Sequence, residues 1–241
     1  MDAIKEFLST ISHEIRTPLT SIKGFSKTML DSWDNLSDEQ KKKFINIIYE
    51  QSKRLSNLVE NAIFVADSSN KYNSSVLKKA DINLILNKSI DIVKINYKDK
   101  IYKTDLTKFP LYSMLDTDNL QQIFVNLLDN ASKYSLNSNV IEIKTNYFSD
   151  KNIISIKNFG IHIDNNNKEK IFEKFYRANS YLTSKTQGSG LGLYIVKTLV
   201  NKMNGEITVK SEEKPIIYSE FIVSFPIFTD EKFAQERRLN V

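Results

Sequence analysis

The chain has 241 residues, of which 41% are hydrophobic and 26% are charged, a balance typical of a soluble globular protein with one or two domains. It contains no cysteine, which excludes disulfides and thiolate metal sites. No apolar run approaches the roughly 20 residues needed to span a bilayer, and the net charge of +5 is interspersed along the chain, so we expect no nucleic-acid partner.

The first predicted element is an amphipathic helix at about 1–32, because its apolar residues recur at three- and four-residue spacing. At roughly 100° per residue, His13 points away from the apolar stripe. Thr17 lies one turn later on the same side. Pro18 removes the backbone donor to the Glu14 carbonyl, so the helix should bend just beyond the histidine.

A polar turn at 31–37 separates this helix from a second one. Ser37 and Gln40 have the spacing of a capping box, and an apolar stripe follows from Phe44 to Ile63. A hairpin of two such helices buries little surface by itself, whereas two copies complete a four-helix bundle. We therefore expect residues 1–68 to be a domain that forms a homodimer.

The polar stretch at 67–75 predicts a linker and a domain boundary. Helices and mostly antiparallel strands follow it, and this order predicts a two-layer α/β sandwich at 76–228, making the chain α+β overall. The charged residues 229–241 are expected to form a tail beyond the fold. The expected helices are 82–97, 117–134 and 194–203, and the expected strands are 101–105, 110–114, 140–147, 153–157, 206–211 and 221–225.

Residues 12–18 read Ser-His-Glu-Ile-Arg-Thr-Pro and resemble the phospho-acceptor box of two-component sensor histidine kinases. The resemblance implies that His13 receives the γ-phosphoryl group of ATP on a ring nitrogen and passes it to an aspartate in the receiver domain of a response regulator. A neutral imidazole has a nitrogen lone pair for this attack. The resemblance assigns Glu14 to hydrogen-bond the other ring nitrogen and Thr17 to position a water that dephosphorylates the partner.

The segment 126–134 resembles the nucleotide-binding N box of the same family. Asn126 and Asn130 are four residues apart and share one helix face, where amide oxygens suit Mg²⁺ and amide donors suit phosphate. Asn130 is the expected metal ligand, Lys133 adds a cation at the helix end, and Tyr134 offers its ring face to adenine. The alternative is an amphipathic helix whose polar side simply faces water.

The run at 187–193 resembles the second glycine box of the family and leads directly into a helix. Closely spaced glycines allow φ > 0 and let the backbone approach phosphates, while the helix start points its amides at them. The polar stretch 178–187 would form a mobile ATP lid. The expected nucleotide contacts here are Gly188, Gly190, Leu191 and Gly192.

The segment 171–177 is similar to the F box, with phenylalanines as core anchors and Arg177 reaching a phosphate. The first glycine box departs from the family pattern. Asn158 replaces the aspartate that accepts a hydrogen bond from the adenine amino group; a neutral bond is worth roughly 1 kcal/mol less, so ATP binding should be about tenfold weaker. Gly160 is retained as a nucleotide contact. His162, expected to face water, replaces a glycine at a cost of about 1–2 kcal/mol if that position needs φ > 0.

The resemblance covers nearly the whole chain and implies a sensor histidine kinase catalytic core with ATP and Mg²⁺ as cofactors and a response regulator as partner. We expect a cytoplasmic location, with a membrane reached only through a region N-terminal to this chain. The substitutions at Asn158 and His162 leave an alternative, a degenerate dimeric signalling scaffold with weak or no ATP binding. A third alternative, a chaperone- or gyrase-type ATPase, is disfavoured because such a protein has no use for the phospho-acceptor box.

Overall fold

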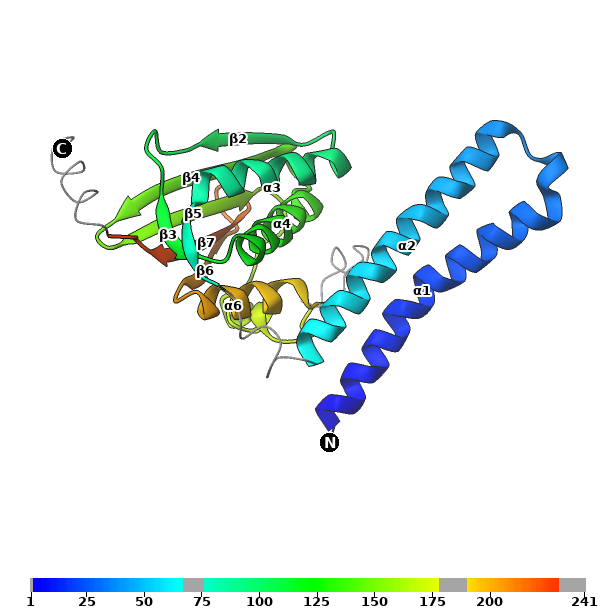
Figure 1. The fold of residues 1–241 in the computed structure, drawn as a ribbon, viewed down its shortest axis with the longest axis horizontal. Helices are drawn as coiled ribbons and strands as arrows, with labels where there is room; N and C mark the ends of the chain where they lie inside the picture. The colour runs from blue at the N-terminus through cyan, green and yellow to red at the C-terminus, as the bar shows by residue number, and fades with distance from the viewer. Residues whose placement is uncertain (1, 67–75, 178–189, 230–241) are drawn as a thin grey trace. The chain divides into compact units, whose positions relative to one another are not determined.

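The computed structural model describes residues 2–66, 76–177 and 190–229 and divides into two compact units. One is a helical hairpin and the other is a mixed α/β unit (Figure 1). Within the described residues, no helix is long and apolar enough to cross a membrane. The predicted linker and, beyond Thr229, the predicted tail lie outside the described residues.

The hairpin consists of α1 (Asp2–Ser32), a short 3₁₀ turn η1 (Trp33–Asn35) and α2 (Asp38–Ala66). The predicted start of the second helix is confirmed by a reciprocal capping box. The Gln40 amide donates to Ser37 Oγ at 3.2 Å, and the Ser37 amide donates to Gln40 Oε1 at 2.9 Å. Two backbone donors that no helical carbonyl could satisfy are thereby paired.

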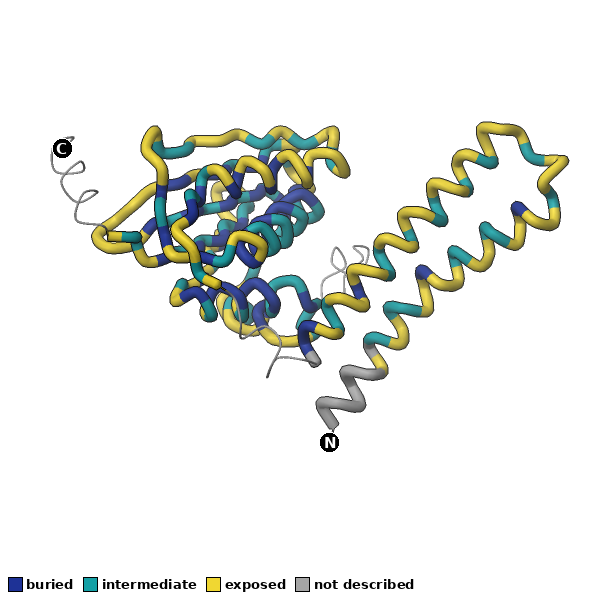
Figure 2. The backbone as a smooth tube through the Cα atoms, in the orientation of Figure 1, coloured by how far each residue is buried: buried dark blue, intermediate teal, exposed yellow. Residues whose placement is uncertain are grey.

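Contacts between α1 and α2 bury only part of the apolar surface of the hairpin. The rings of Phe25 and Phe44 meet with their centroids 5.1 Å apart, and Met29 is buried. Many other large apolar side chains of the two helices stay exposed. Figure 2 shows exposed positions, in yellow, recurring along both helices. They are Leu19, Leu30, Ile45, Tyr49, Val59 and Ile63.

The α/β unit is built on a five-stranded sheet with the order β2-β4-β5-β7-β6, in which only β2 and β4 run parallel. Among the described residues, α-helices α3, α4 and α6 form the second layer (Figure 1), so the predicted two-layer sandwich is confirmed. The strands of this sheet are β2 (Ile101–Asp105), β4 (Val140–Phe148), β5 (Lys151–Asn158), β6 (Glu206–Glu212) and β7 (Tyr218–Pro226). The helices are α3 (Ile82–Asn96), α4 (Thr117–Tyr134) and α6 (Gly192–Lys202), with short 3₁₀ turns η3 (Asn165–Asn167) and η4 (Lys170–Phe172).

A second, two-stranded sheet joins β1 (Lys78–Asp81) to β3 (Tyr112–Leu115). The sequence did not predict β1, because Lys-Lys-Ala-Asp has neither alternation nor β-branched residues. It forms because β3 supplies backbone partners. The predicted helix cap at Asp81 is confirmed, since its Oδ1 accepts a hydrogen bond from the Asn83 amide at 3.0 Å.

The side of the sheet that faces the helices is apolar along most of its width and polar at one end. Alternate residues of β5 and β7 are buried, and the buried apolar residues of α4 pack above them. At the end of β5 the buried row becomes polar: Asn158 pairs in register with Ser219 on β7, and Ser219 pairs with Ser211 on β6. The fold therefore places a polar row where the chain leaves β5.

Candidate functional site

The candidate phospho-acceptor, His13, is exposed on α1, on the side away from the partly buried apolar stripe, as the helical spacing predicts. Thr17 is exposed one turn later, and its hydroxyl donates to the His13 carbonyl at 3.4 Å. Pro18 is buried inside α1, and it has no amide to bond the Glu14 carbonyl. The imidazole is thus presented to solvent on a continuous helix, one turn of which lacks a backbone hydrogen bond because of the proline.

Glu14 makes a contact that the sequence did not predict. Its Oε2 lies 3.1 Å from Nη2 of Arg54 on α2, and the two side chains are only 17% and 21% exposed. A shielded ion pair of this kind holds two helices in one register. The available signal was a basic residue within the inward-facing stripe of the second helix. The role expected for Glu14 at the His13 ring stays a prediction.

In the α/β unit, α4 begins at an Asp116 cap that accepts from the Asp118 and Asn119 amides at 3.0 Å. Asn126, Asn130, Lys133 and Tyr134 all lie along the half-buried side of the helix, next to its buried apolar face.

Asn126 is fixed within this face by its own helix and lies against the start of α6. Its Nδ2 donates to the Gln122 carbonyl at 3.0 Å. A Cβ added to Gly192 would lie 3.2 Å from Asn126 Oδ1, so the missing side chain lets α6 begin directly beside this amide. The backbone N–H groups at the start of α6 therefore lie close to the Asn126 side-chain amide of α4. Such a group of hydrogen-bond donors suits an anionic ligand.

Lys133 is held by a small network. Its Nζ lies 2.5 Å from Asp129 Oδ2, and the Tyr97 hydroxyl donates to Asp129 Oδ1 at 2.8 Å. Burial, together with the Asp129 charge, raises the pKa of Tyr97 well above its usual range, so the phenol keeps its proton and acts as a donor. The sequence did not predict Tyr97 or Asp129 as site residues, because their contact spans 32 positions.

Asn158 closes the other side of the site from the end of β5. Its side chain is buried, with 2% of the residue exposed, and its Nδ2 has no hydrogen-bond partner within the described part of the chain. Such buried, unpaired donors are rare in folded proteins. A ligand atom that accepts a hydrogen bond, such as a purine ring nitrogen, would satisfy it.

Gly160 is required by close approach and not by its backbone angles, since Gly190 is the one described glycine with positive φ. A Cβ at Gly160 would overlap the Tyr134 carbonyl oxygen and lie 2.6 Å from the Leu136 nitrogen. The Asn137 amide also donates to the Phe159 carbonyl at 3.1 Å. These contacts bring the end of β5 against the end of α4.

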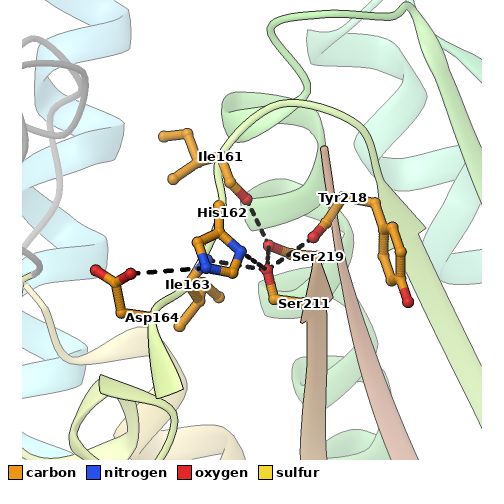
Figure 3. Close-up of polar contacts among 7 residues, drawn as sticks. All are labelled: Ile161, His162, Ile163, Asp164, Ser211, Tyr218 and Ser219. Carbon is orange, nitrogen blue, oxygen red and sulfur yellow. Dashed lines mark hydrogen bonds and ion pairs between the residues drawn. The ribbon is translucent and has the colours of Figure 1, made fainter. Parts of the chain in front are cut away.

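His162 does not have the strained backbone that a glycine-requiring position would impose. The described non-glycine residues with positive φ are Ser149, Phe175 and Asn204. Contrary to the expectation of a water-facing loop histidine, its ring is partly covered and contacts β6 (Figure 3). Nδ1 lies 3.2 Å from Ser211 Oγ, and Nε2 lies 3.6 Å from the Asp164 carboxylate.

The remaining predicted residues lie around the start of α6 and the F-box segment. Gly190 has φ 70°, which a glycine adopts without strain, and Leu191 is buried. Phe172 is buried and meets Phe221 edge-on at 6.4 Å, which confirms it as a core anchor, and Arg177 is half-buried. Gly188 and the predicted lid at 178–187 lie outside the described residues.

Comparison with known families identifies a domain in each unit. Residues 3–70 match the His Kinase A (phospho-acceptor) domain, and residues 115–228 match the Histidine kinase-, DNA gyrase B-, and HSP90-like ATPase family. The sensor protein kinase WalK of Staphylococcus aureus is 32% identical over 212 residues, which cover 87% of this chain and 51% of that relative. For WalK of strain JH9 the covered share of the relative is 34%. The chain thus spans a third to a half of these curated relatives.

Solved structures share the fold. Histidine kinase ThkA, in a complex with the response regulator protein TrrA, is 25% identical with a TM-score of 0.67, and the match covers 92% of this chain and 61% of that one. Full-length ShkA in complex with AMPPNP is 23% identical with a TM-score of 0.63, over 93% of this chain and 46% of that one.

Proposed function

Because this chain belongs to the two-component sensor histidine kinases, we propose that it phosphorylates His13 from ATP and passes the phosphoryl group to a response regulator aspartate. The observation that carries the proposal is the pairing, in one chain, of an exposed helical imidazole with a cradle of amides and glycines that suits a nucleotide. In the transfer, an imidazole nitrogen bonds to the γ-phosphorus, the bond to the β–γ bridging oxygen breaks, and ADP leaves.

Within the cradle, the residues of α4 bind the phosphate end of the nucleotide. The amide oxygens of Asn126 and Asn130 suit Mg²⁺, which neutralises the charge of the phosphates, and the Lys133 ammonium adds a positive charge. Tyr97 and Asp129 keep that ammonium from swinging into solvent. The structure of ShkA with AMPPNP supports a nucleotide at this fold.

The base of the nucleotide is assigned to the end of β5. Asn158 turns a buried amide toward it, and its Oδ1 is assigned to accept a neutral hydrogen bond from the adenine amino group. Gly160 keeps the segment close enough to α4 that the base can lie beside Tyr134. The absence of a carboxylate at Asn158 is the reason to expect binding about tenfold weaker than with aspartate there.

At the phospho-acceptor, Glu14 and Thr17 are assigned to orient the His13 ring and a hydrolytic water. The Glu14–Arg54 ion pair would have to open, or be shared, for the Glu14 carboxylate to reach the imidazole. Arg54 therefore holds the carboxylate ready one residue from His13.

Two partners follow from this function. The exposed apolar side chains of α1 and α2 favour a second copy of the hairpin, which would bury them in a four-helix bundle. A response regulator is the second partner, supported by the complex of ThkA with TrrA. The use of ATP places the proposed activity on the cytoplasmic side.

The direct test is incubation of the parent chain and a His13→Gln variant with γ-labelled ATP and Mg²⁺. The parent should become labelled and the variant should not, and the label should then move to an added receiver domain. Equal labelling of both proteins would remove His13 from the mechanism.

A second candidate function is a dimeric scaffold that binds a regulator without efficient catalysis, which the replacements at Asn158 and His162 favour. Titration calorimetry separates the two. Micromolar affinity for MgATP supports the kinase, whereas no binding at millimolar nucleotide supports the scaffold.

A further inference from the structure

The segment 159–164, which carries Gly160, has no regular secondary structure and is held from two sides. The end of α4 holds its first half, through the contacts of Phe159 and Gly160 described above. The β6–β7 hairpin holds its second half, through the polar cluster drawn in Figure 3. The second set of contacts has no part in the function proposed so far.

Two serines make these contacts from neighbouring positions on β6 and β7. Ser219 Oγ donates to the Ile161 carbonyl at 2.6 Å, and the Ile163 amide donates to Ser211 Oγ at 2.9 Å. The two hydroxyls are 3.3 Å apart and both residues are buried. The backbone on both sides of His162 is therefore hydrogen-bonded to the sheet. One of the two serines that hold it, Ser219, is also the residue that pairs in register with Asn158.

The His162 ring adds a third bond to the same hydroxyl. A serine hydroxyl has one proton and two lone pairs. Ser211 gives its proton to the Tyr218 carbonyl at 2.7 Å and accepts from the Ile163 amide, so its second lone pair faces His162 Nδ1 at 3.2 Å. For a bond to form there, Nδ1 must carry a hydrogen. Every bonding position of the hydroxyl is then used.

Asp164 contributes less to this arrangement than Ser211 does. Its carboxylate oxygen is 3.6 Å from His162 Nε2, beyond hydrogen-bond distance, and its side chain is 75% exposed. The contact that orients the ring is therefore the one to the buried hydroxyl.

We propose that His162 is a positioning residue for nucleotide binding: by donating from Nδ1 to Ser211, it fixes the 159–164 segment on the β6–β7 hairpin and so keeps Asn158 and Gly160 in binding geometry. This inference rests on the nucleotide site proposed above. A glycine in its place would remove the bond and increase the backbone freedom of the segment. Nucleotide binding would then have to order the segment, and the entropy lost in doing so would weaken the affinity.

The experiment is titration calorimetry of MgATP with the full chain and five variants. His162→Gly should weaken binding about fivefold. Ser211→Ala should weaken it at least as much, because it also removes the bonds to the Ile163 amide and the Tyr218 carbonyl. The double variant should be no weaker than Ser211→Ala, because that change already removes the His162 bond. His162→Asn should bind like the parent, since the asparagine Nδ2 is as far along the side chain as the histidine Nδ1. Ser224→Ala, which lies on the opposite face of β7, is the matched control and should change nothing.

A spectroscopic readout accompanies the titration. Long-range ¹H–¹⁵N spectra of the nucleotide-free parent should show the His162 Nδ1–H tautomer, and this signature should disappear in Ser211→Ala. If the His162 side chain only filled space, neither the Nδ1–H tautomer in the parent nor its loss in Ser211→Ala would be required.

The possible failures are distinguishable. If the parent binds MgATP and His162→Gly binds equally well, or if the Nε2–H tautomer is found, the positioning role is overturned while the nucleotide site stands. Additive losses in the double variant, or no rescue by His162→Asn, also overturn it. If the parent itself binds no MgATP, the nucleotide site is overturned and this inference with it.

Discussion

The hairpin and the α/β unit position their candidate functional residues by opposite means. His13 is carried by a helix whose backbone bonds are all local, and it needs only an outward direction on that helix. The 159–164 segment has no such repeat, and its order depends on residues as far away in sequence as Ser219, 58 positions from Ile161. We therefore expect substitutions around the nucleotide site to be costly and those on the exposed side of the hairpin to be mild.

The largest expected difference is between two glycines. Gly160→Ala should abolish nucleotide binding and lower the free energy of unfolding of the α/β unit by about 3 kcal/mol, since its Cβ would overlap main-chain atoms that cannot move aside. Gly24→Ala in α1 meets nothing within 4 Å and should raise hairpin stability by roughly 0.5–1 kcal/mol. Chemical denaturation of both variants measures the contrast, and a neutral Gly160→Ala would contradict the close contact.

The next effect tests the contact between Glu14 and Arg54, which joins the phospho-acceptor region to α2. Arg54→Met should destabilise the hairpin by about 2 kcal/mol, because the shielded Glu14 carboxylate loses its partner. Lys53→Met, at an exposed neighbouring position, is the control and should change stability by less than about 0.5 kcal/mol. Thermal unfolding provides the measurement. Equal stability of the two variants would mean that the ion pair contributes nothing.

Asn158→Asp should strengthen MgATP binding about tenfold, because a charge-assisted bond replaces a neutral one. The same change should lower the unfolding temperature without nucleotide, since a carboxylate at a position 2% exposed is poorly solvated. In this one variant the affinity for MgATP, measured by titration calorimetry, should rise while the unfolding temperature without nucleotide falls. Weaker binding by Asn158→Asp would show that the amide itself makes a contact the carboxylate cannot make.

The smallest effect concerns Tyr97, whose pKa burial and Asp129 raise well above its usual range. The folded state therefore favours the protonated phenol, and the resulting stability is complete below the ordinary tyrosine pKa of about 10 and is lost as pH rises above it. Between pH 9.5 and 11, the parent should lose stability faster than Tyr97→Phe, by about 1 kcal/mol per pH unit. At pH 7 the variant should be less stable by about 1 kcal/mol. Tyr49→Phe, at an exposed position, serves as the control, and parallel pH profiles of the parent and Tyr97→Phe would contradict the assignment.

Elements with a strong periodic pattern were predictable because their hydrogen bonds and buried faces are local. The helix at 117–134 was predicted at the bounds that α4 has, and the capping box at Ser37 and the cap at Asp81 were also read correctly. The short strand β1 was not predicted, since its four residues gain their conformation only from pairing with β3.

The amino-acid sequence by itself determined the motifs and their helical faces: the outward direction of His13 and the shared face of Asn126 and Asn130 follow from a fixed rotation per residue. The tertiary structure decided which side chains hold those motifs in place. The pairing of Glu14 with Arg54 and the binding of His162 to Ser211 join residues 40 and 49 positions apart. No local pattern encodes such contacts, because they arise only when separate elements pack and bury the same polar atoms.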